Sequence, residues 1–389
     1  MAVLGDGAGG DGHAAVGGPR RILVVNAGSS SLKLRLLDHA DAVVASADLP
    51  AVRGATDARL VADAVAAWGG EAVDAVGHRV VHGGTMFTGP VLVDERVLAR
   101  LATLTDLAPL HQPKSLAALE AVGAVLPDVP AVACFDTAFH ATLPAAASTY
   151  ALPSQWRQRW DLRRYGFHGL SHAYAARRVA ALCGRAGDAT LRVVTCHLGA
   201  GASLAAVAGG RSVDTTMGFT PLEGLVMATR SGTVDPGLVL WLAEHVGMPP
   251  AELAATLEHR SGLLGLAGTD DMRAILSGAE GGEAGHRLAL EVYLHRLRGA
   301  IATMTAAMGG LDAIAFTGGV GERAPAIRSM AADGLGFLGI SLDAVANEGH
   351  GTGDHEIGAP GAAVRAFVIP AREDVEIARE VRQTISATA

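Results

Sequence analysis

Three glycine-rich turns, each following an apolar run, are the first candidates for chemistry in this sequence. They are AGSSS at 27–31, HLGAGAS at 197–203 and FTGGVGE at 316–322. Backbone N–H groups at such turns form concave sites for anions, and glycine lets a phosphate group approach closely. The third turn also opens a predicted helix, whose N-terminus adds partial positive charge. Together the three turns favour phosphate binding, with an ordinary hairpin as the alternative for each one.

Three arginines accompany these turns. Arg79 stands at the end of an apolar strand in GHRVVHGG, Arg230 precedes a Ser-Gly turn in MATRSGTVDPG, and Arg273 begins a predicted helix in TDDMRAI. An arginine in an apolar setting needs either a structural carboxylate or an anionic ligand. Both interpretations stay open for each of the three.

Histidines and one aspartate form the next group. In RRYGFHGLSH, His168 and His172 are spaced to share a helical face, but two histidines without a third ligand make a poor metal site. We expect Ser171 to cap the helix, His172 to lie in the core and His168 to donate a hydrogen bond into a cleft. Asp136 ends the apolar strand in ACFDTAFH, where α/β proteins usually place their chemistry.

The elements that position these residues follow from apolar periodicity and turn residues. In the first half we expect strands over 21–25, 31–37, 41–49, 75–81 and 130–136, and helices over 57–68, 94–107 and 113–125. In the second half we expect three strands within 191–216, a helix over 285–308, a strand over 312–317, a helix after the third turn, a strand over 366–370 and a closing helix over 372–387.

Both halves open with strand, glycine-rich turn and strand. This repetition predicts a duplicated α/β unit with a cleft between the two copies. The alternative is chance recurrence of hairpins in a chain with 50 glycines.

Composition narrows the class of protein. Half of the 389 residues are apolar and only 18% are charged, so two domains with large cores are expected. The net charge of -8 argues against nucleic acid as the main partner. Three cysteines without a CxxC spacing predict buried, reduced thiols and a cytosolic location. No signal peptide or membrane span is expected, and residues 1–19 are interpreted as a flexible glycine-rich tail.

Several well-known motifs are missing. The sequence has no Walker A motif, no strand-linked GxGxxG, no HExxH and no GxSxG nucleophile elbow. P-loop NTPases, Rossmann dehydrogenases, zinc proteases and α/β-hydrolases are therefore disfavoured.

The chain resembles the acetokinase family of the acetate and sugar kinase/Hsp70/actin superfamily. The matching segments are VVNAGSSSLKLRLL, GHRVVHGG, LAPLHQP, FDTAFH, RRYGFHGLSH, CHLGAG, the stretch 214–237, TDDMR, FTGGVGE and IPARED. The resemblance implies an α/β fold of two duplicated ribonuclease H-like (actin-like ATPase) domains with an active-site cleft between them. It places the first domain at 20–138 plus 373–389 and the second at 139–372.

The resemblance also implies roles for individual residues. The catalytic set is Arg79, Asp136, His168 and Arg230, and the acyl-substrate set is Arg79, Val81, Leu110, His111, Phe167 and Pro221. The nucleotide set is Lys33, His197, Leu198, Gly199, Ala200, Gly201, Asp271, Met272, Arg273, Gly319, Val320, Gly321, Glu322 and Arg323. Asn26 and Glu373 match the residues associated with Mg²⁺, for which Mn²⁺ is the alternative.

The implied activity is reversible, Mg²⁺-dependent, in-line transfer of the γ-phosphoryl group of ATP to acetate, giving acetyl phosphate and ADP. The implied enzyme is a cytoplasmic homodimer without nucleic acid or membrane partners. Such a transfer requires positioning and neutralisation of spreading negative charge, which arginine and histidine side chains supply. A carboxylic acid with a pKa of about 4.3 is already ionised at neutral pH. We therefore expect Asp136 to orient Arg79 or magnesium-bound water rather than to act as a base.

Three positions depart from the usual family pattern. Ala200 and Arg323 stand in nucleotide segments where asparagine is usual, and Thr233 replaces an aspartate. ATP is the expected donor, with another nucleoside triphosphate or pyrophosphate as alternatives. A propionate or butyrate kinase is the nearest other enzyme, although Val81 and Phe167 leave little room for a longer acid. A nucleotide-gated binding protein like actin or Hsp70 is the alternative from another class.

Overall fold

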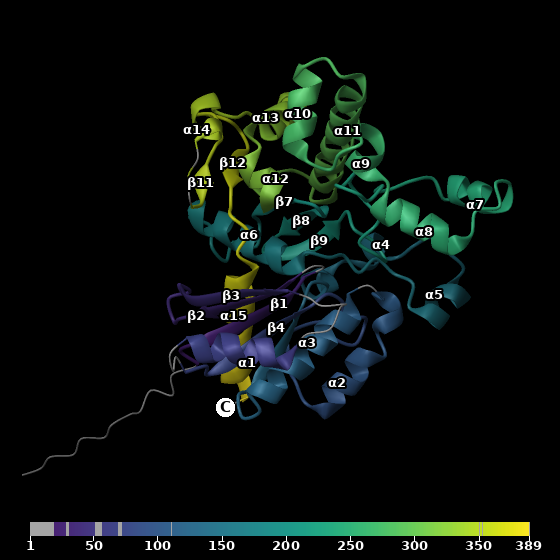
Figure 1. Cartoon of the computed structure of the whole chain (residues 1–389). Coiled ribbons are helices and arrows are strands. Elements are labelled where there is room, and N and C mark those ends of the chain that lie inside the picture. Colours follow the sequence, from purple (N-terminus) through teal and green to yellow (C-terminus); the bar gives the residue numbers. More distant parts are fainter. Residues whose placement is uncertain are drawn as a thin grey trace, which may run out of the picture.

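The computed structural model describes residues 19–28, 31–50, 57–68, 72–109, 111–349, 351 and 353–388. Two six-stranded mixed sheets form its framework. Figure 1 shows the first sheet, coloured purple and blue, on one side of the molecule and the second sheet, coloured teal to yellow, on the other. The predicted tail over 1–19 lies almost wholly outside the described residues.

The first sheet has the order β3-β2-β1-β4-β6-β5. Strands β1 to β3 form an antiparallel meander, β4 and β6 run parallel to β1, and β5 is antiparallel to β6. The strand bounds are β1 (Ile22–Ala27), β2 (Ser31–Leu37), β3 (Val43–Pro50), β4 (Ala75–Val80), β5 (Val91–Leu92) and β6 (Ala131–Phe135).

The second sheet repeats this plan, with the order β9-β8-β7-β10-β12-β11 when read from the same edge. Its meander is again antiparallel, β10 and β12 are parallel to β7, and β11 is antiparallel to β12. The strand bounds are β7 (Arg192–Leu198), β8 (Ala202–Ala208), β9 (Arg211–Thr215), β10 (Ala313–Thr317), β11 (His355–Glu356) and β12 (Arg365–Val368). Chance hairpins would not reproduce six strands in one order with the same directions, so the predicted duplication is confirmed.

Helices cover both sheets. The α-helices are α1 (Ala58–Ala67), α2 (Glu95–Ala102), α3 (Gln112–Val125), α4 (Ala145–Ser148), α5 (Ser154–Trp160), α6 (Gly169–Leu182), α7 (Pro236–Glu244), α8 (Pro250–His259), α9 (Gly262–Ala267), α10 (Met272–Glu280), α11 (Ala284–Ala307), α12 (Gly318–Arg323), α13 (Pro325–Asp333), α14 (Ala344–Glu348) and α15 (Glu373–Thr388). Short 3₁₀ turns are η1 (Thr105–Leu107), η2 (Ala138–Thr142) and η3 (Gly336–Leu338). None of the described helices is long and apolar enough to cross a membrane.

Two helices, α6 and α15, lie between the sheets and join them. Helix α15 packs on β1, β4, β6 and α6, while α6 packs on β7 and β10. Their buried faces share one hydrophobic cluster with both sheets, which includes Ile22, Cys134, Ala175, Val193 and Ile377. In Figure 1 the yellow α15 lies against the purple strands of the first sheet, although the strand before it in the chain, β12, belongs to the second sheet. The residues that precede α6 and begin α15 are therefore held by a common core.

Three details differ from the predictions. The helix expected over 94–107 is split into α2 and the 3₁₀ turn η1. The third glycine-rich turn is itself helix α12. Its first residue, Gly318, takes φ +78°, and a Cβ there would stand 2.8 Å from the Leu198 carbonyl oxygen. Cys183 ends α6 in a partly exposed position, whereas Cys134 and Cys196 are buried as expected.

Candidate active site

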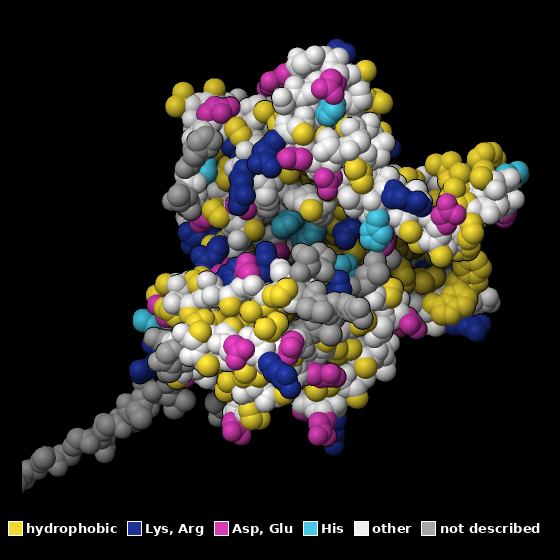
Figure 2. All heavy atoms as spheres, in the orientation of Figure 1, with side chains coloured by type: hydrophobic (Ala, Val, Ile, Leu, Met, Phe, Trp, Pro, Cys, Tyr) yellow, Lys and Arg dark blue, Asp and Glu magenta, His cyan; other side chains and the backbone are white. Residues whose placement is uncertain are grey.

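The parallel strands of both sheets end at the gap between the two halves. Asn26 lies near the end of β1, Arg79 near the end of β4, Asp136 directly after β6 and His197 near the end of β7. Carboxyl ends of parallel strands are the usual ligand sites of α/β sheets. Figure 2 shows histidine, lysine and arginine side chains gathered in the hollow between the halves. The duplicated topology thus brings candidate residues from both copies to one place.

Arg79 is the centre of a polar cluster from the first half. Its Nε and Nη2 donate to the two carboxylate oxygens of Asp136 at 3.0 and 2.6 Å, and Nη1 donates to Asn26 Oδ1 at 3.1 Å. The Glu373 Oε2 atom lies 3.8 Å from Arg79 Nε. Asp136 is only 1% exposed, so burial opposes its charge while the guanidinium favours it. This bidentate pair fixes the plane of the Arg79 guanidinium.

His168 and His197 form a stacked pair from the second half. Their ring centroids are 4.3 Å apart with an interplanar angle of 25°. Burial, together with the neighbouring His197, lowers the pKa of His168 well below its usual value. Burial also lowers the pKa of His197 to about 4. Both imidazoles are therefore neutral at pH 7 in the free protein.

The turn that carries His168 is tightly constrained. His168 has φ +56°, which is unusual for a residue with a side chain. On one side, Gly169 N donates to the Asp136 carbonyl oxygen at 2.8 Å, and a Cβ on Gly169 would stand 2.3 Å from that oxygen. On the other side, Gly166 takes φ +73° against the ring of His140. The glycines of YGFHG are thus required by close packing around the histidine.

The three arginines found in the sequence have different environments. Arg273 is 91% exposed and pairs with Asp271 in its own turn, and Arg79 pairs with Asp136. Arg230 is partly buried, and among the residues that the structure describes it forms no ion pair; its Nη1 donates to the Pro221 carbonyl oxygen at 3.4 Å. Burial lowers the pKa of Arg230, yet a guanidinium stays protonated at neutral pH. Arg230 is therefore a cation available to an anionic ligand.

His111 lies close to two of these cations. It precedes α3, and burial lowers its pKa to about 4, with further lowering by Arg230 and Arg79. A neutral imidazole here lies beside both guanidinium groups.

The predicted acyl pocket is described in part. Val81 and Phe167 are 8% and 2% exposed and belong to the same hydrophobic cluster. Pro221 contacts Arg230 through its carbonyl oxygen. Leu110 lies outside the described residues.

The first glycine-rich turn joins β1 and β2 as a hairpin. Gly28 N donates to the Ser31 carbonyl oxygen at 2.9 Å, while the two serines between them lie outside the described residues. Asn26 and Lys33 are directly opposite each other across the two strands. Directly paired residues share one face of a sheet, so both side chains leave from the same side.

The three predicted nucleotide segments meet in one pocket of about 490 Å³. Its lining includes Gly199, Ala200, Asp271, Met272, Arg273, Gly319, Val320 and Arg323 from those segments. Leu263, Leu276 and Tyr293 add apolar and aromatic surface. A volume of this size with a mainly apolar wall and a few polar groups is typical of small-molecule sites. The other predicted members of those segments are not among the lining residues; they are His197, Leu198, Gly201, Gly321 and Glu322.

The side-chain oxygens of Asn26 and Glu373 are the candidate ligands of a metal ion. Asn26 Oδ1 accepts from Arg79 Nη1 and Glu373 Oε2 lies 3.8 Å from Arg79 Nε, so both oxygens lie beside one guanidinium group. Among the described ranges no three His, Cys, Asp or Glu residues form a ready metal cluster. Mg²⁺ uses one or two protein oxygens and completes its shell with water and phosphate oxygens. The amide and carboxylate therefore fit Mg²⁺ when a phosphate substrate is present.

Several polar residues around the site were not predicted. Ser203 contacts His168 Nδ1 at 2.9 Å, and His140 Nε2 donates to the Phe167 carbonyl oxygen at 3.0 Å. We expected Ser171 to cap α6, and this prediction is wrong. Its hydroxyl instead contacts His197 Nδ1 at 2.8 Å. His172 is fully buried, so its predicted place in the core is confirmed. The sequence signal that could have identified Ser203 and His140 is a polar residue within an apolar segment.

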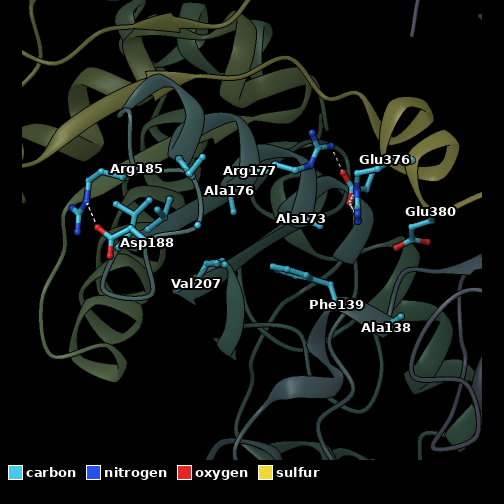
Figure 3. Close-up of a pocket in the computed structure, with 18 of the residues that line it drawn as sticks. Ala138, Phe139, Ala173, Ala176, Arg177, Arg185, Asp188, Val207, Glu376 and Glu380 are labelled. Carbon is cyan, nitrogen blue, oxygen red and sulfur yellow. Dashed lines mark hydrogen bonds and ion pairs between the residues drawn. The ribbon is translucent and has the colours of Figure 1, made fainter. Parts of the chain in front are cut away.

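A separate cavity of about 560 Å³ lies between α6 and α15 (Figure 3). Phe139, Ala176 and Val207 supply apolar wall, and Glu376 and Glu380 come from α15. None of the predicted site residues lines this cavity. Arg177 pairs with Glu376, so its charge is already neutralised. We therefore assign the candidate chemistry to the strand ends and not to this cavity.

Comparisons with known proteins show which family of proteins this chain is similar to. A model of the acetokinase family matches residues 59–379. An acetate kinase of Leifsonia xyli is 45% identical, covering 94% of this chain and 99% of the relative. The crystal structure of an acetate kinase of Porphyromonas gingivalis superposes with a TM-score of 0.86 at 34% identity, covering 94% and 99% of the chains. A propionate kinase of Francisella tularensis gives 0.85 at 33% identity, covering 92% and 98%.

Proposed function

This chain belongs to the acetokinase family, and from that premise we propose that it transfers the γ-phosphoryl group of ATP to acetate, reversibly, giving acetyl phosphate and ADP. The observation that carries the proposal is the cationic cluster at the strand ends. The His168 ring and Arg230 Nη1 both lie beside Gly201, where a Cβ would stand 3.3 and 3.5 Å from them. The charges of Arg79 and Arg230 both lower the pKa of His168. A nucleotide-gated binding protein without an acyl substrate has no use for such a cluster.

The transfer assigns each side chain a distinct task. Arg79 grips the acetate carboxylate, and Asp136 holds the Arg79 guanidinium in plane. The carboxylate oxygen attacks the γ-phosphorus as the bond to the ADP oxygen breaks, so no enzyme-bound intermediate is needed. Arg230 and His168 bind the equatorial oxygens, where negative charge spreads. Acetate is already ionised, so no base is required.

Asn26 and Glu373 would hold Mg²⁺, with Mn²⁺ as a substitute. The ion would neutralise charge shared by the β- and γ-phosphates. Support for this assignment is that both oxygens lie beside the Arg79 guanidinium.

The pocket of about 490 Å³ is the proposed nucleotide site. Its apolar wall suits a purine base, and Lys33 on the opposite half would contact phosphate oxygens. Ala200 lines the pocket with a methyl group, and Arg323 adds a cation there. These two residues bear on the choice of donor, for which GTP and pyrophosphate are the alternatives to ATP.

We also propose a homodimer. Trp156 and Trp160 of α5 and Leu238, Leu240 and Trp241 of α7 are 47–60% exposed. Figure 2 shows an apolar patch where these helices project from the molecule. Exposed patches of this kind are typical of interfaces, and a second copy of the chain is the proposed occupant.

The domain division follows the sheets. We propose residues 20–138 plus 373–389 as one domain and 139–372 as the other. Support comes from α15, which packs on β1, β4 and β6 although it follows β12 in the chain. A cytoplasmic location is proposed from the free thiols of all three cysteines.

A hydroxamate assay for acyl phosphate tests the activity. Acetate, propionate and butyrate would each be supplied with ATP, GTP or pyrophosphate, with and without Mg²⁺. The expected result is acetyl phosphate from acetate and ATP, only with the metal. A higher kcat/KM for propionate would reassign the acceptor, since one methylene is worth about 1–3 kcal/mol in a pocket. The absence of acyl phosphate in every mixture would contradict the proposal.

A further inference from the structure

A chain of hydrogen-bonding side chains leads from His168 into the core of the second half. His168 Nδ1 lies 2.9 Å from Ser203 Oγ, which lies 2.8 Å from His172 Nε2. His172 Nδ1 in turn lies 2.8 Å from Thr195 Oγ1. Ser203, His172 and Thr195 are fully buried. Buried polar atoms must find partners within the protein, so the protons of this chain are arranged together.

Each hydroxyl and each neutral imidazole carries one proton, and a hydroxyl oxygen can accept two hydrogen bonds. If Ser203 accepted from both histidines, its own buried proton would have no acceptor among the described residues. Two arrangements remain that make every link and bond every hydroxyl proton. In the first, Thr195 donates to His172 Nδ1, His172 Nε2 donates to Ser203, and Ser203 donates to His168 Nδ1. The proton of His168 then sits on Nε2. In the second, every link is reversed, and His168 carries its proton on Nδ1 with a bare Nε2.

The two arrangements differ at the inner end of the chain. In the reversed one, the Thr195 hydroxyl gives its proton to the Ala205 carbonyl oxygen, which is 3.5 Å away. That distance is at the limit of a hydrogen bond and contributes little. At the outer end, His168 Nε2 forms no hydrogen bond to the described residues and is not among their buried unpartnered atoms, so it is open to solvent. It lies beside Gly201, where a Cβ would stand 3.3 Å from it. Phosphoryl oxygens accept hydrogen bonds, so a ligand in the cleft favours the arrangement with a proton on Nε2.

We propose that Thr195, His172 and Ser203 hold His168 as the Nε2–H tautomer, so that a neutral imidazole offers its N–H to the transferring phosphoryl group. The three residues are positioning residues. The purpose assigned to them rests on the proposed phosphoryl transfer. A fixed tautomer matters because the wrong one presents a lone pair to an anionic oxygen. Burial keeps both histidines neutral, lowering the pKa of His172 as well as that of His168.

The backbone completes the arrangement. His140 Nε2 donates to the Phe167 carbonyl oxygen, and Gly169 N donates to the Asp136 carbonyl oxygen at 2.8 Å. The peptide groups before and after His168 are therefore both anchored while its φ stays at +56°. Backbone strain of this kind persists only where the surroundings hold it, often at functional sites. Because the backbone is held, the hydrogen-bonded side chains control which ring nitrogen of His168 carries the proton.

Nitrogen NMR of the full-length protein, labelled with ¹⁵N-histidine, tests the tautomer directly. The His168 signals are assigned by their loss in His168→Gln. We expect a protonated Nε2 and an unprotonated Nδ1 in the wild-type protein at pH 7. Ser203→Ala and Thr195→Val should both give mixed tautomers, although Thr195 does not contact His168. Ser148→Ala removes a buried hydroxyl of α4 that bonds only to the Pro144 carbonyl oxygen, and should leave the His168 spectrum unchanged.

Kinetics complete the test. We expect Ser203→Ala to lower kcat about 10- to 100-fold, as residues that orient a functional side chain do, with little change in the KM for acetate. Ser148→Ala should retain full kcat. A protonated Nδ1 in the wild-type protein, or an unchanged spectrum in Ser203→Ala, would overturn the inference. If Nε2 is protonated but no acyl phosphate forms, the proposed function fails while the tautomer assignment stands.

Discussion

Replacing Asp136 with asparagine separates positioning of Arg79 from general-base catalysis. Asp136 is 1% exposed and makes two hydrogen bonds to the guanidinium, at 2.6 and 3.0 Å. Removing one partner of a buried ion pair costs about 3–5 kcal/mol, because the other charge stays buried without compensation. Glu373 lies 3.8 Å from Arg79 and offsets part of that loss. We therefore expect the free energy of unfolding to fall by about 3 kcal/mol.

The kinetic effect should fall on kcat. An Arg79 released from Asp136 keeps its charge and still attracts acetate, so the KM for acetate should not rise. The carboxylate is then held in the wrong orientation, and a misplacement of about 1 Å costs on the order of 100-fold in rate. The measurement is kcat and KM for acetate from pH 6 to 9, together with urea unfolding. Because no base is lost, the ratio of wild-type to variant kcat should be independent of pH.

A matched control lies on the surface. Glu356 also forms a bidentate pair, with Arg365 at 2.8 and 2.6 Å, but both side chains are about 40% exposed. Glu356→Gln should cost less than about 1 kcal/mol in stability and leave kcat unchanged. The reasoning is refuted if Asp136→Asn retains full kcat and an unchanged Mg²⁺ requirement, or if its kcat ratio titrates with pH as loss of a base would.

Three further substitutions or conditions give sharp expectations. Gly201→Ala places a methyl group 3.3 Å from the His168 ring, and we expect kcat to fall about 10-fold with little change in the melting temperature. Burial lowers the pKa of His78 to about 3 and of His140 to about 4. The contribution of each neutral histidine to the free energy of unfolding is fully present above about pH 6.5. It falls by about 1.4 kcal/mol per pH unit as the pH drops from there towards 4, which urea unfolding measures. Burial raises the pKa of Glu380 from 4.5 to about 7, so its protonated form stabilises the fold below pH 4.5 and this contribution is lost as the pH rises through 7. Glu380→Gln should therefore gain stability over the wild type between pH 5 and pH 8, by roughly 3 kcal/mol at most.

Each of these has a result that counts against it. Full activity in Gly201→Ala would mean that the loop does not press on the histidine. Equal unfolding free energies of Glu380→Gln at pH 7 and pH 5, where the opposing Glu380 titration is removed, would mean that the buried histidines are not held neutral. A constant difference between Glu380→Gln and the wild type at all pH values would mean that the Glu380 pKa is not raised.

The sheet framework was predictable from the sequence because its signals are local. Alternation in SLKLRLL, glycine-rich turns and the repeated strand–turn–strand plan predicted the strands and the duplication, and the strand order confirms both. Parallel pairing of β4 with β6 then explains why Arg79 and Asp136, both at strand ends, lie together. The roles of these and the other candidate residues stay predictions.

Features that depend on partners far apart in the sequence could not be predicted. Ser203 contacts His168 across 35 positions, and Ser171 turned from an expected cap into a partner of His197. The positive φ of His168 has no local signature, because the neighbouring elements impose it. Likewise, Gly318 approaches β7 so closely that a Cβ would stand 2.8 Å from the Leu198 carbonyl oxygen, which periodicity does not reveal.

The position of α15 has a consequence for biosynthesis. Ile377 and Val381 are fully buried and press on Gly77, where a Cβ would stand 2.4 Å from the Ile377 side chain. The face of β1, β4 and β6 that they cover stays exposed on the ribosome until every strand of the second sheet has been made. Domains usually fold in the order of their synthesis, and exposed apolar sheet faces attract chaperones. In this chain, the half that leaves the ribosome first is the half that is completed last.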